Sequence, residues 1–161
     1  MIVKNDVYFM RKAIECANKA AEIGEAPIGA VIVKDGIIIS RAYNKREIKK
    51  NALYHAEILA IDKACKKLNT FRLNDCVMYV TLEPCPMCAG AIINARLKKV
   101  VFGAYDPKRG CVGSIYNLLE DKRFNHNPQV QGGIMEKECS QLLSDFFSKK
   151  RLENKENASQ N

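Results

Sequence analysis

The spacing of apolar residues predicts an alternation of helices and strands along the chain. Apolar positions recur every three to four residues in three segments, which are expected to be helices with one buried face: residues 6–24, 56–68 and 136–152. Runs rich in Val and Ile, which are typical of strands, occupy three others: residues 29–40, 76–83 and 98–104. Asp6 is a suitable N-cap for the first helix, and Asp35-Gly36 predicts that the first run is a β-hairpin.

The order of elements between residues 76 and 104 predicts an α/β fold. A strand at 76–83 runs into a helix at 86–96, with Pro86 in the first turn, where proline is tolerated, and a strand follows at 98–104. A strand, a helix and a strand in this order form a crossover unit, so the strands are expected to pair in parallel with helices on the sheet face. Residues 105–129 are mostly polar, and a loop of this length is often functional.

Length and composition indicate one domain of a globular protein. The chain has 161 residues, of which 47% are hydrophobic and 27% charged. We expect the domain to span residues 1–153 and the polar residues 154–161 to form a disordered tail. No apolar run reaches the roughly 20 residues that cross a bilayer, and residues 1–10 lack the apolar centre of a signal peptide. We therefore expect no membrane partner and a cytoplasmic location.

The charge of the chain favours a polyanionic partner. The formal net charge is +8, and contacts from Lys and Arg to phosphates dominate the affinity of proteins for nucleic acids. Basic residues are concentrated at 41–50 and at 148–155. Charge alone does not separate a nucleic-acid partner from a contribution to solubility.

Two of the seven cysteines have the spacing of metal ligands, Cys85 and Cys88. The other five stand among apolar neighbours and are expected to be small buried side chains: Cys16, Cys65, Cys76, Cys111 and Cys139. An odd number of cysteines without an export signal favours reduced thiols. The Cys-x-x-Cys pair can be a redox pair, half of a structural zinc site or half of a catalytic one. The redox interpretation lacks a thioredoxin-like context, and the structural one lacks a second pair of Cys or His at short spacing.

His55 and Glu57 favour a catalytic zinc site. Such sites use three protein ligands and leave a fourth position for water, and His55 can be the third ligand beside Cys85 and Cys88. The histidine and the cysteines open two different helices, so both positively polarised helix starts are expected to face one site. Glu57 could exchange protons with the water without binding the metal, or it could simply compensate its helix dipole. His126, the second histidine, is expected to be a surface or loop residue.

The pattern His-x-Glu followed by Pro-Cys-x-x-Cys is the known signature of the zinc-dependent nucleobase and nucleoside deaminases. Here it reads HAE at 55–57 and PCPMC at 84–88. Over residues 7–151 the chain resembles the bacterial tRNA-specific adenosine deaminases, through APIGAVIV, HAEILAI, TLEPCPMCAGAII, VVFGAYDPKRG and LLSDFF. The resemblance implies a cytidine deaminase-like fold, with three α/β/α layers around a mixed five-stranded sheet. It also implies a homodimer with one Zn²⁺ per subunit, which binds a tRNA anticodon stem-loop and converts its wobble adenosine to inosine.

The resemblance also implies roles for single residues. The implied zinc ligands are His55, Cys85 and Cys88. The implied proton shuttle is Glu57. Substrate contacts are implied at four positions: Asn44, Ala56, Asp106 and Phe147. Asn44 would hydrogen-bond the flipped base, and Asp106 would contact the sugar and backbone of the nucleotide. Phe147 and the basic residues after it would touch the anticodon loop.

Two departures from the family pattern concern loops rather than the zinc or proton chemistry. The segment NALY at 51–54 replaces the more usual Asp-Pro-Thr-Ala, and Tyr105 stands where arginine is common. Pro86 also occurs in guanine deaminases of the same fold, so it does not distinguish a tRNA adenosine deaminase from a guanine deaminase. Two other functions therefore stay open: a deaminase of free guanine or cytosine, which needs no polyanion contacts, and a noncatalytic zinc-stabilised RNA-binding domain, which has no need of Glu57.

Overall fold

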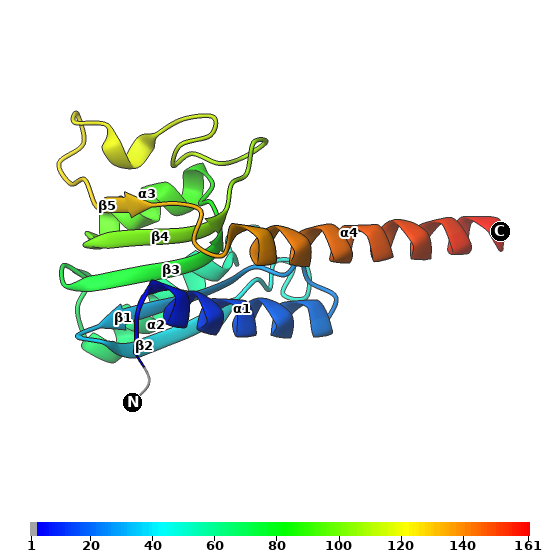
Figure 1. Ribbon diagram of the computed structural model, residues 1–161, viewed down its shortest axis with the longest axis horizontal. Helices are drawn as coiled ribbons and strands as arrows, with labels where there is room; N and C mark the ends of the chain where they lie inside the picture. Colours follow the sequence, from blue (N-terminus) through cyan, green and yellow to red (C-terminus); the bar gives the residue numbers. More distant parts are fainter. Residues whose placement is uncertain (1–2) are drawn as a thin grey trace.

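The computed structural model describes residues 3–161 and is built around a five-stranded sheet in the order β2-β1-β3-β4-β5. A single-turn 3-10 helix, Leu118–Glu120, lies in the long loop before the last strand. The helices and strands follow the chain in this order (Figure 1): α1 (Asp6–Glu22), β1 (Gly29–Lys34), β2 (Ile37–Tyr43), α2 (Ala56–Leu68), β3 (Cys76–Leu82), α3 (Pro86–Ala95), β4 (Lys99–Ala104), β5 (Gln129–Gln131) and α4 (Glu136–Ser159). The first two residues of the expected domain, 1–153, lie outside the described part of the chain.

Helices cover both faces of the sheet, which confirms the expected three-layer α/β/α fold. Helices α1 and α4 lie on one face, and α2 and α3 lie on the other (Figure 1). Alternate residues of a strand supply the two cores: Met78 and Val80 of β3 pack with α2 and α3, whereas Tyr79 between them packs with α1. Because the central strands are buried on both faces, their sequences are continuous apolar runs rather than alternating ones.

The sheet is mixed, with an antiparallel part and a parallel part. Strand β1 pairs antiparallel with β2 and β3, whereas β3, β4 and β5 pair in parallel, as the crossover pattern predicted. The hairpin turns at Asp35 and Gly36, whose φ angles of 50° and 74° suit a type I′ turn. At the other end of the sheet, Leu82 of β3 pairs with Ala104 of β4. Ligands of open α/β sheets bind beyond the carboxyl ends of the strands, so this end is where a site is expected.

The start of α1 differs from the sequence prediction by one residue. The N-cap is Asn5 rather than Asp6, because the Asn5 side chain accepts a hydrogen bond of 3.0 Å from the backbone N–H of Tyr8. The Asp6 carboxylate instead accepts a hydrogen bond of 2.7 Å from the hydroxyl of Tyr79, on the adjacent sheet. The competing partner lies far away in the sequence, which is why local pattern did not reveal it.

The end of the chain also differs from the prediction. Residues 154–161 were expected to be a disordered tail, but α4 continues to Ser159. The last turns contain Glu, Lys and Ala, which are good helix formers, so the helical backbone persists although these side chains are exposed. The second half of α4 extends well beyond the sheet (Figure 1). Neither α4 nor any other helix within residues 3–161 is long and apolar enough to cross a membrane.

Candidate active site

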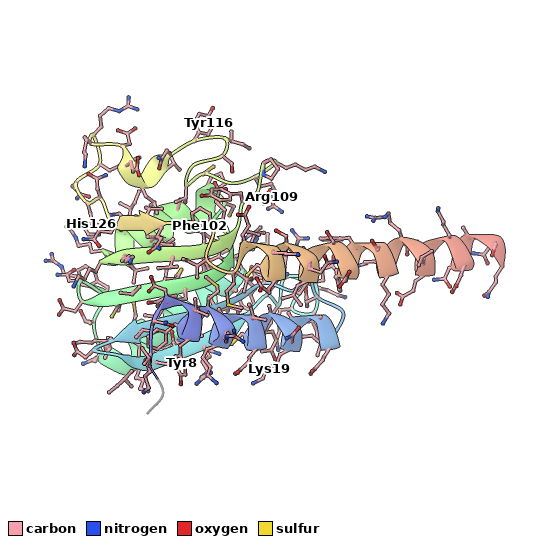
Figure 2. All side chains as sticks on the ribbon, viewed as in Figure 1. Tyr8, Lys19, Phe102, Arg109, Tyr116 and His126 are labelled. Atoms are coloured by element: carbon pink, nitrogen blue, oxygen red, sulfur yellow. The ribbon has the colours of Figure 1, made fainter. Side chains whose placement is uncertain are left out.

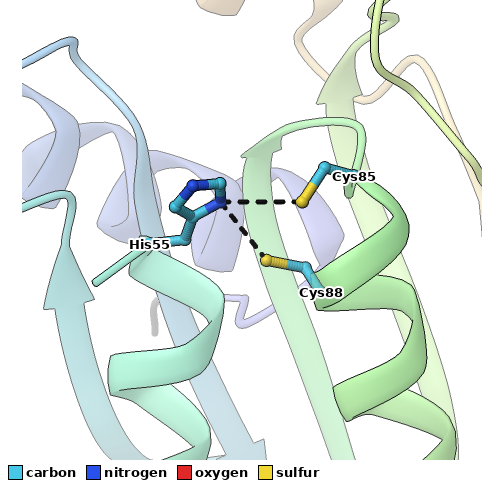
Figure 3. Close-up of side chains that lie close together, drawn as sticks. All are labelled: His55, Cys85 and Cys88. Atoms are coloured by element: carbon cyan, nitrogen blue, oxygen red, sulfur yellow. Dashed lines mark hydrogen bonds between the residues drawn. The ribbon is translucent and has the colours of Figure 1, made fainter. Parts of the chain in front are cut away.

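Two helices begin beside one another and present three metal-ligating side chains. His55 is the N-cap of α2, and Cys85 is the N-cap of α3, with Pro86 in the first turn of α3. Neither N-cap side chain hydrogen-bonds the N–H groups of its own helix, so both remain directed to the space between the helices. Figure 3 shows His55, Cys85 and Cys88 pointing toward one another. The structure therefore brings together the three ligands predicted from the sequence.

The distances within this cluster fit a metal ion. Nδ1 of His55 lies 3.6 Å from Sγ of Cys85 and 3.6 Å from Sγ of Cys88 (Figure 3). A tetrahedral zinc ion, with bonds of about 2.1 Å to nitrogen and 2.3 Å to sulfur, separates such atoms by about 3.6 Å. Two thiolates and an imidazole are also a donor set that suits zinc. The residues present therefore fit this ion, with one coordination position left for a fourth ligand.

The two thiols of the cluster titrate as a pair. Hydrogen bonding with Cys88 is the largest effect that lowers the pKa of Cys85, and together with His55 it overcomes burial and brings this pKa to about 3. The hydrogen bond with Cys85 and burial raise the pKa of Cys88. The hydrogen bond with Cys85 also raises the pKa of His55. The cluster thus holds one thiolate readily, and a bound cation would favour the second.

Glu57 lies beside the cluster but does not belong to it. Its side chain is buried in the first turn of α2, with 4% of the residue exposed, and it lines the same cavity as His55. Burial raises the pKa of the Glu57 carboxyl, and hydrogen bonds from its own backbone and from Cys88 act in the opposite direction. A buried carboxyl two residues after His55 is in a position to exchange protons with a molecule held at the cluster.

The remaining cysteines and the second histidine lie outside the cluster. In residues 3–161, the only group of three or more His, Cys, Asp or Glu side chains suited to a metal ion is His55, Cys85 and Cys88. Nε2 of His126 is instead 2.7 Å from the carbonyl oxygen of Leu97. Of the five other cysteines, four are buried as predicted and Cys65 is half-buried. The cluster therefore lacks the fourth protein ligand of a structural zinc site.

A cavity of about 530 Å³ opens above Glu57 and His55. All four residues predicted to contact the substrate line it: Asn44, Ala56, Asp106 and Phe147. Asn44 and Ala56 are buried, whereas 43% of Phe147 is exposed. The side chain of Asn44 accepts a hydrogen bond from the N–H of Arg46 and donates one to the carbonyl oxygen of Ala26. The cavity brings these residues together, while their roles toward a substrate remain predictions.

Comparison with known proteins now decides the family. A tRNA-specific adenosine deaminase from Bacillus subtilis is 54% identical over 150 residues, which cover 93% of each chain. This chain belongs to the tRNA-specific adenosine deaminase family. A homologous enzyme from Aquifex aeolicus is 48% identical over 89% of this chain and 95% of its own. A family profile described as MafB19-like deaminase matches residues 4–151.

Solved structures agree with this membership. A structure from work on A-to-I editing by tRNA:A34 deaminases at the wobble position superposes with a TM-score of 0.81. It is 42% identical and covers 84% of this chain and 99% of the other. A guanine deaminase from Bacillus subtilis is 44% identical, with a TM-score of 0.61, over 63% of this chain and 65% of its own. The match to the tRNA:A34 deaminase thus spans more of both chains.

Several of the residues that line the cavity were not singled out from the sequence. Three of them are basic: Arg46, Lys108 and Arg109. Arg151, a fourth basic residue of the lining, belongs to the basic segment after Phe147 that was expected to touch the anticodon loop. Figure 2 places Arg109 on the loop after β4, close to the first turns of α4, which also line the cavity through Leu143. Tyr105 lines the cavity too, with its ring edge-to-face with Phe102 at 5.0 Å. The signals available were the run of charges after Asp106 and the basic segment at 41–50, which do not by themselves show which side chains converge.

Proposed function

We propose that this protein hydrolytically deaminates adenosine to inosine at the wobble position of a tRNA anticodon, with zinc as its cofactor. The observation that carries the proposal is the position of Glu57, buried beside a His-Cys-Cys cluster at the base of a cavity that Asn44 and Phe147 also line. The activity of close relatives agrees with it. In this reaction water replaces the exocyclic amino group, and ammonia is released.

His55, Cys85 and Cys88 would hold the zinc ion. When bound, zinc supplies a water molecule whose pKa is lowered to about 7, so that a nucleophile is available at neutral pH. The starts of α2 and α3 point their positive ends at the same place, which helps to hold thiolates there.

Glu57 would carry the protons of the reaction. Its carboxylate would accept a proton from the attacking water and deliver it to the ring nitrogen of the purine. It would then accept the remaining proton of the added hydroxyl group and deliver it to the amino group, which leaves as ammonia while the carbonyl of inosine forms. One member of the cluster, His55, and the carboxylate lie on the same short segment of chain, because His55 and Glu57 flank Ala56 at the start of α2. A rigid helix start therefore keeps the carboxylate at a fixed position relative to the attacked carbon.

Asn44 would orient the purine. Its amide has both a donor and an acceptor, so it can pair with an edge of the base. The hydrogen bonds from Arg46 and to Ala26 fix the amide in one orientation, with spare acceptor and donor capacity left for a ligand. Phe147 at the cavity mouth has an exposed ring on which a nucleobase can stack.

An anticodon loop suits this site better than a duplex. A base in a loop is already unpaired, so its insertion into a cavity does not require a base pair to be broken. The basic residues around the cavity are placed to contact the phosphates on either side of that base. The homodimer implied by the resemblance and the cytoplasmic location expected from the sequence stay predictions.

The test is deamination by the purified zinc-loaded protein of an anticodon stem-loop with adenosine at the wobble position. Free adenosine, guanine and cytosine, and a stem-loop with the adenosine moved to a stem, are assayed in parallel. We expect inosine from the wobble position only. Turnover of free guanine or cytosine in place of the stem-loop would instead identify a small-molecule deaminase, and zinc binding with no turnover at all would identify a noncatalytic domain.

Basic residues at the start of the exposed part of α4 are expected to contribute to RNA affinity. Arg151 lines the cavity, and Lys149 and Lys150 line a neighbouring groove beside Phe146. Replacing the three with glutamine should weaken stem-loop binding and make the slope of log K against log salt less negative by up to about 2, because each phosphate contact on a single strand contributes about 0.7. Fluorescence anisotropy across a salt series measures this slope.

The matched control removes the same charge elsewhere. Lys63, Lys66 and Lys67 are exposed near the far end of α2, away from its catalytic start. Their replacement with glutamine should change the slope much less. An equal change in both triple variants would mean that net charge, rather than the position of these residues on α4, determines the affinity.

A further inference from the structure

The loop between β4 and the 3-10 helix is fastened to one buried carboxylate, that of Glu83. Oε1 accepts hydrogen bonds from the backbone N–H of Asp106 at 3.1 Å and from the hydroxyl of Ser114. Oε2 accepts the backbone N–H groups of Val112 at 3.1 Å and of Ser114 at 3.0 Å. Four donors from one loop thus converge on a single side chain, of which 2% is exposed.

The position of Glu83 explains why it can reach the loop. It follows β3 directly, and its backbone N–H donates to the carbonyl oxygen of Ala104, the last residue of β4, at 2.8 Å. The next residue but one is Cys85, and the carbonyl oxygen of Pro84 accepts the N–H of Cys111 at 2.9 Å. One short segment after β3 therefore supplies both a metal ligand and the anchor of the loop.

The anchored loop carries residues of the cavity wall. Asp106, Lys108 and Arg109 all line the cavity. Oδ1 of Asp106 accepts the backbone N–H groups of Lys108 and Arg109, each at 3.1 Å, so the position of Asp106 fixes the turn on which the two basic residues stand. Glu83 in turn fixes Asp106 through its backbone N–H.

We propose that Glu83 is a positioning residue for substrate binding, which holds Asp106, Lys108 and Arg109 at the cavity through the backbone of their loop. The proposal rests on the proposed function, because it assigns these residues to the RNA. Glu83 does not line the cavity, so it touches neither the substrate nor the reacting atoms. A buried carboxylate without hydrogen-bond donors would destabilise the folded protein. The four charge-assisted hydrogen bonds therefore favour the one loop conformation in which all four donors reach Glu83.

The first test replaces Glu83 with glutamine, which has the same shape but turns one oxygen into a donor. At least one loop N–H then faces an N–H₂ group instead of an acceptor. We expect KM for the stem-loop to rise about tenfold or more with kcat changed much less, since misplacement by about 1 Å can cost about 100-fold and a loss confined to KM indicates lost uniform binding. Zinc content should stay at one ion per chain.

A second variant disturbs the same contact from the loop side. A Cβ added at Gly110 would lie 2.3 Å from the carboxylate of Glu83 and 2.6 Å from the carbonyl oxygen of Asp106, so the loop must shift. Gly110→Ala should therefore raise KM in the same way, although it alters no polar group and lies outside the segment that holds the metal ligands. It keeps the proposal testable if the first variant does not fold.

Tyr79→Phe is the control for a purely structural effect. It removes a hydrogen bond of 2.7 Å to Asp6 from a buried residue that packs with α1, on the face of the sheet away from α2 and α3. It should lower thermal stability and leave KM unchanged. If both loop variants also lose only stability or zinc content with an unchanged KM, Glu83 has a folding role alone and the proposal is wrong.

A readout without turnover separates this proposal from the proposed function. Lys108 and Arg109 are exposed, so trypsin can cleave after them when the loop opens. We expect both loop variants, and not Tyr79→Phe, to be cleaved there several-fold faster than the unaltered protein. If the unaltered protein does not deaminate the stem-loop, the proposed function fails. If trypsin cleaves the unaltered protein, the two loop variants and Tyr79→Phe at the same rate, Glu83 does not hold the loop, whatever the activity.

Discussion

Glu57→Gln is expected to abolish deamination while the metal stays bound. Glutamine has the size of glutamate and can hydrogen-bond in the cavity, but it cannot accept a proton from water at neutral pH. General acid–base catalysis contributes about 10²- to 10⁴-fold to the rate, so kcat should fall by about 100-fold or more. Metal analysis and an inosine or ammonia assay, made on the same sample, separate metal binding from turnover.

The stability of this variant gives a second readout. Glu57 is buried and burial raises the pKa of its carboxyl, so the charged form is disfavoured in the folded protein. A neutral glutamine removes that cost, and the variant should unfold at the same temperature as the unaltered protein or higher. Asp62→Asn, an exposed change in the same helix, is the control and should keep full activity. Substantial turnover by the glutamine variant would contradict the role of Glu57 in proton transfer.

Cys88→Ser is expected to lose both the metal and the activity. Cys88 is fully buried, and its Sγ is one of three atoms suited to bind a metal ion that lie within 4.8 Å of one another. A serine hydroxyl is a much weaker zinc ligand than a thiolate, so the metal affinity should fall by more than about 100-fold, the upper range for changes in groups that only support the ligands. Metal content after dialysis and the unfolding temperature with and without added zinc measure the effect.

The control for this variant is a cysteine outside the cluster. Cys65 is half-buried toward the end of α2, and Cys65→Ser should bind one zinc ion and unfold at a temperature that rises with added zinc. The unfolding temperature of Cys88→Ser should not respond to zinc over the same range. A zinc response in Cys88→Ser as large as in the control would mean that the ion binds elsewhere on the chain.

The sequence determined the local features of this protein and the chemistry of its cluster. The Asp35-Gly36 turn, the start of α3 at Pro86 and the start of α2 after His55 all lie where the pattern predicted, because each depends on backbone preferences of adjacent residues. The spacing of His55 and Glu57 within one helix turn likewise fixed their proximity. The cysteine pair was recognisable because two cysteines three residues apart at the start of one helix need no distant partner to be close.

The tertiary structure decided everything that depends on residues far apart in the chain. It selected Asn5 over Asp6 as the N-cap, because Asp6 bonds Tyr79 on the sheet. It brought the loop after β4 beside the end of β3, since β3 and β4 pair in parallel and their carboxyl ends lie together. The packing of the chain also brought α4 to the same cavity. It also gave Glu83 its partners, which lie 23 to 31 residues away and follow no short-range pattern. Spacing along a chain predicts contacts within a turn of helix or a hairpin, whereas the packing of helices on a sheet selects which distant side chains share a site.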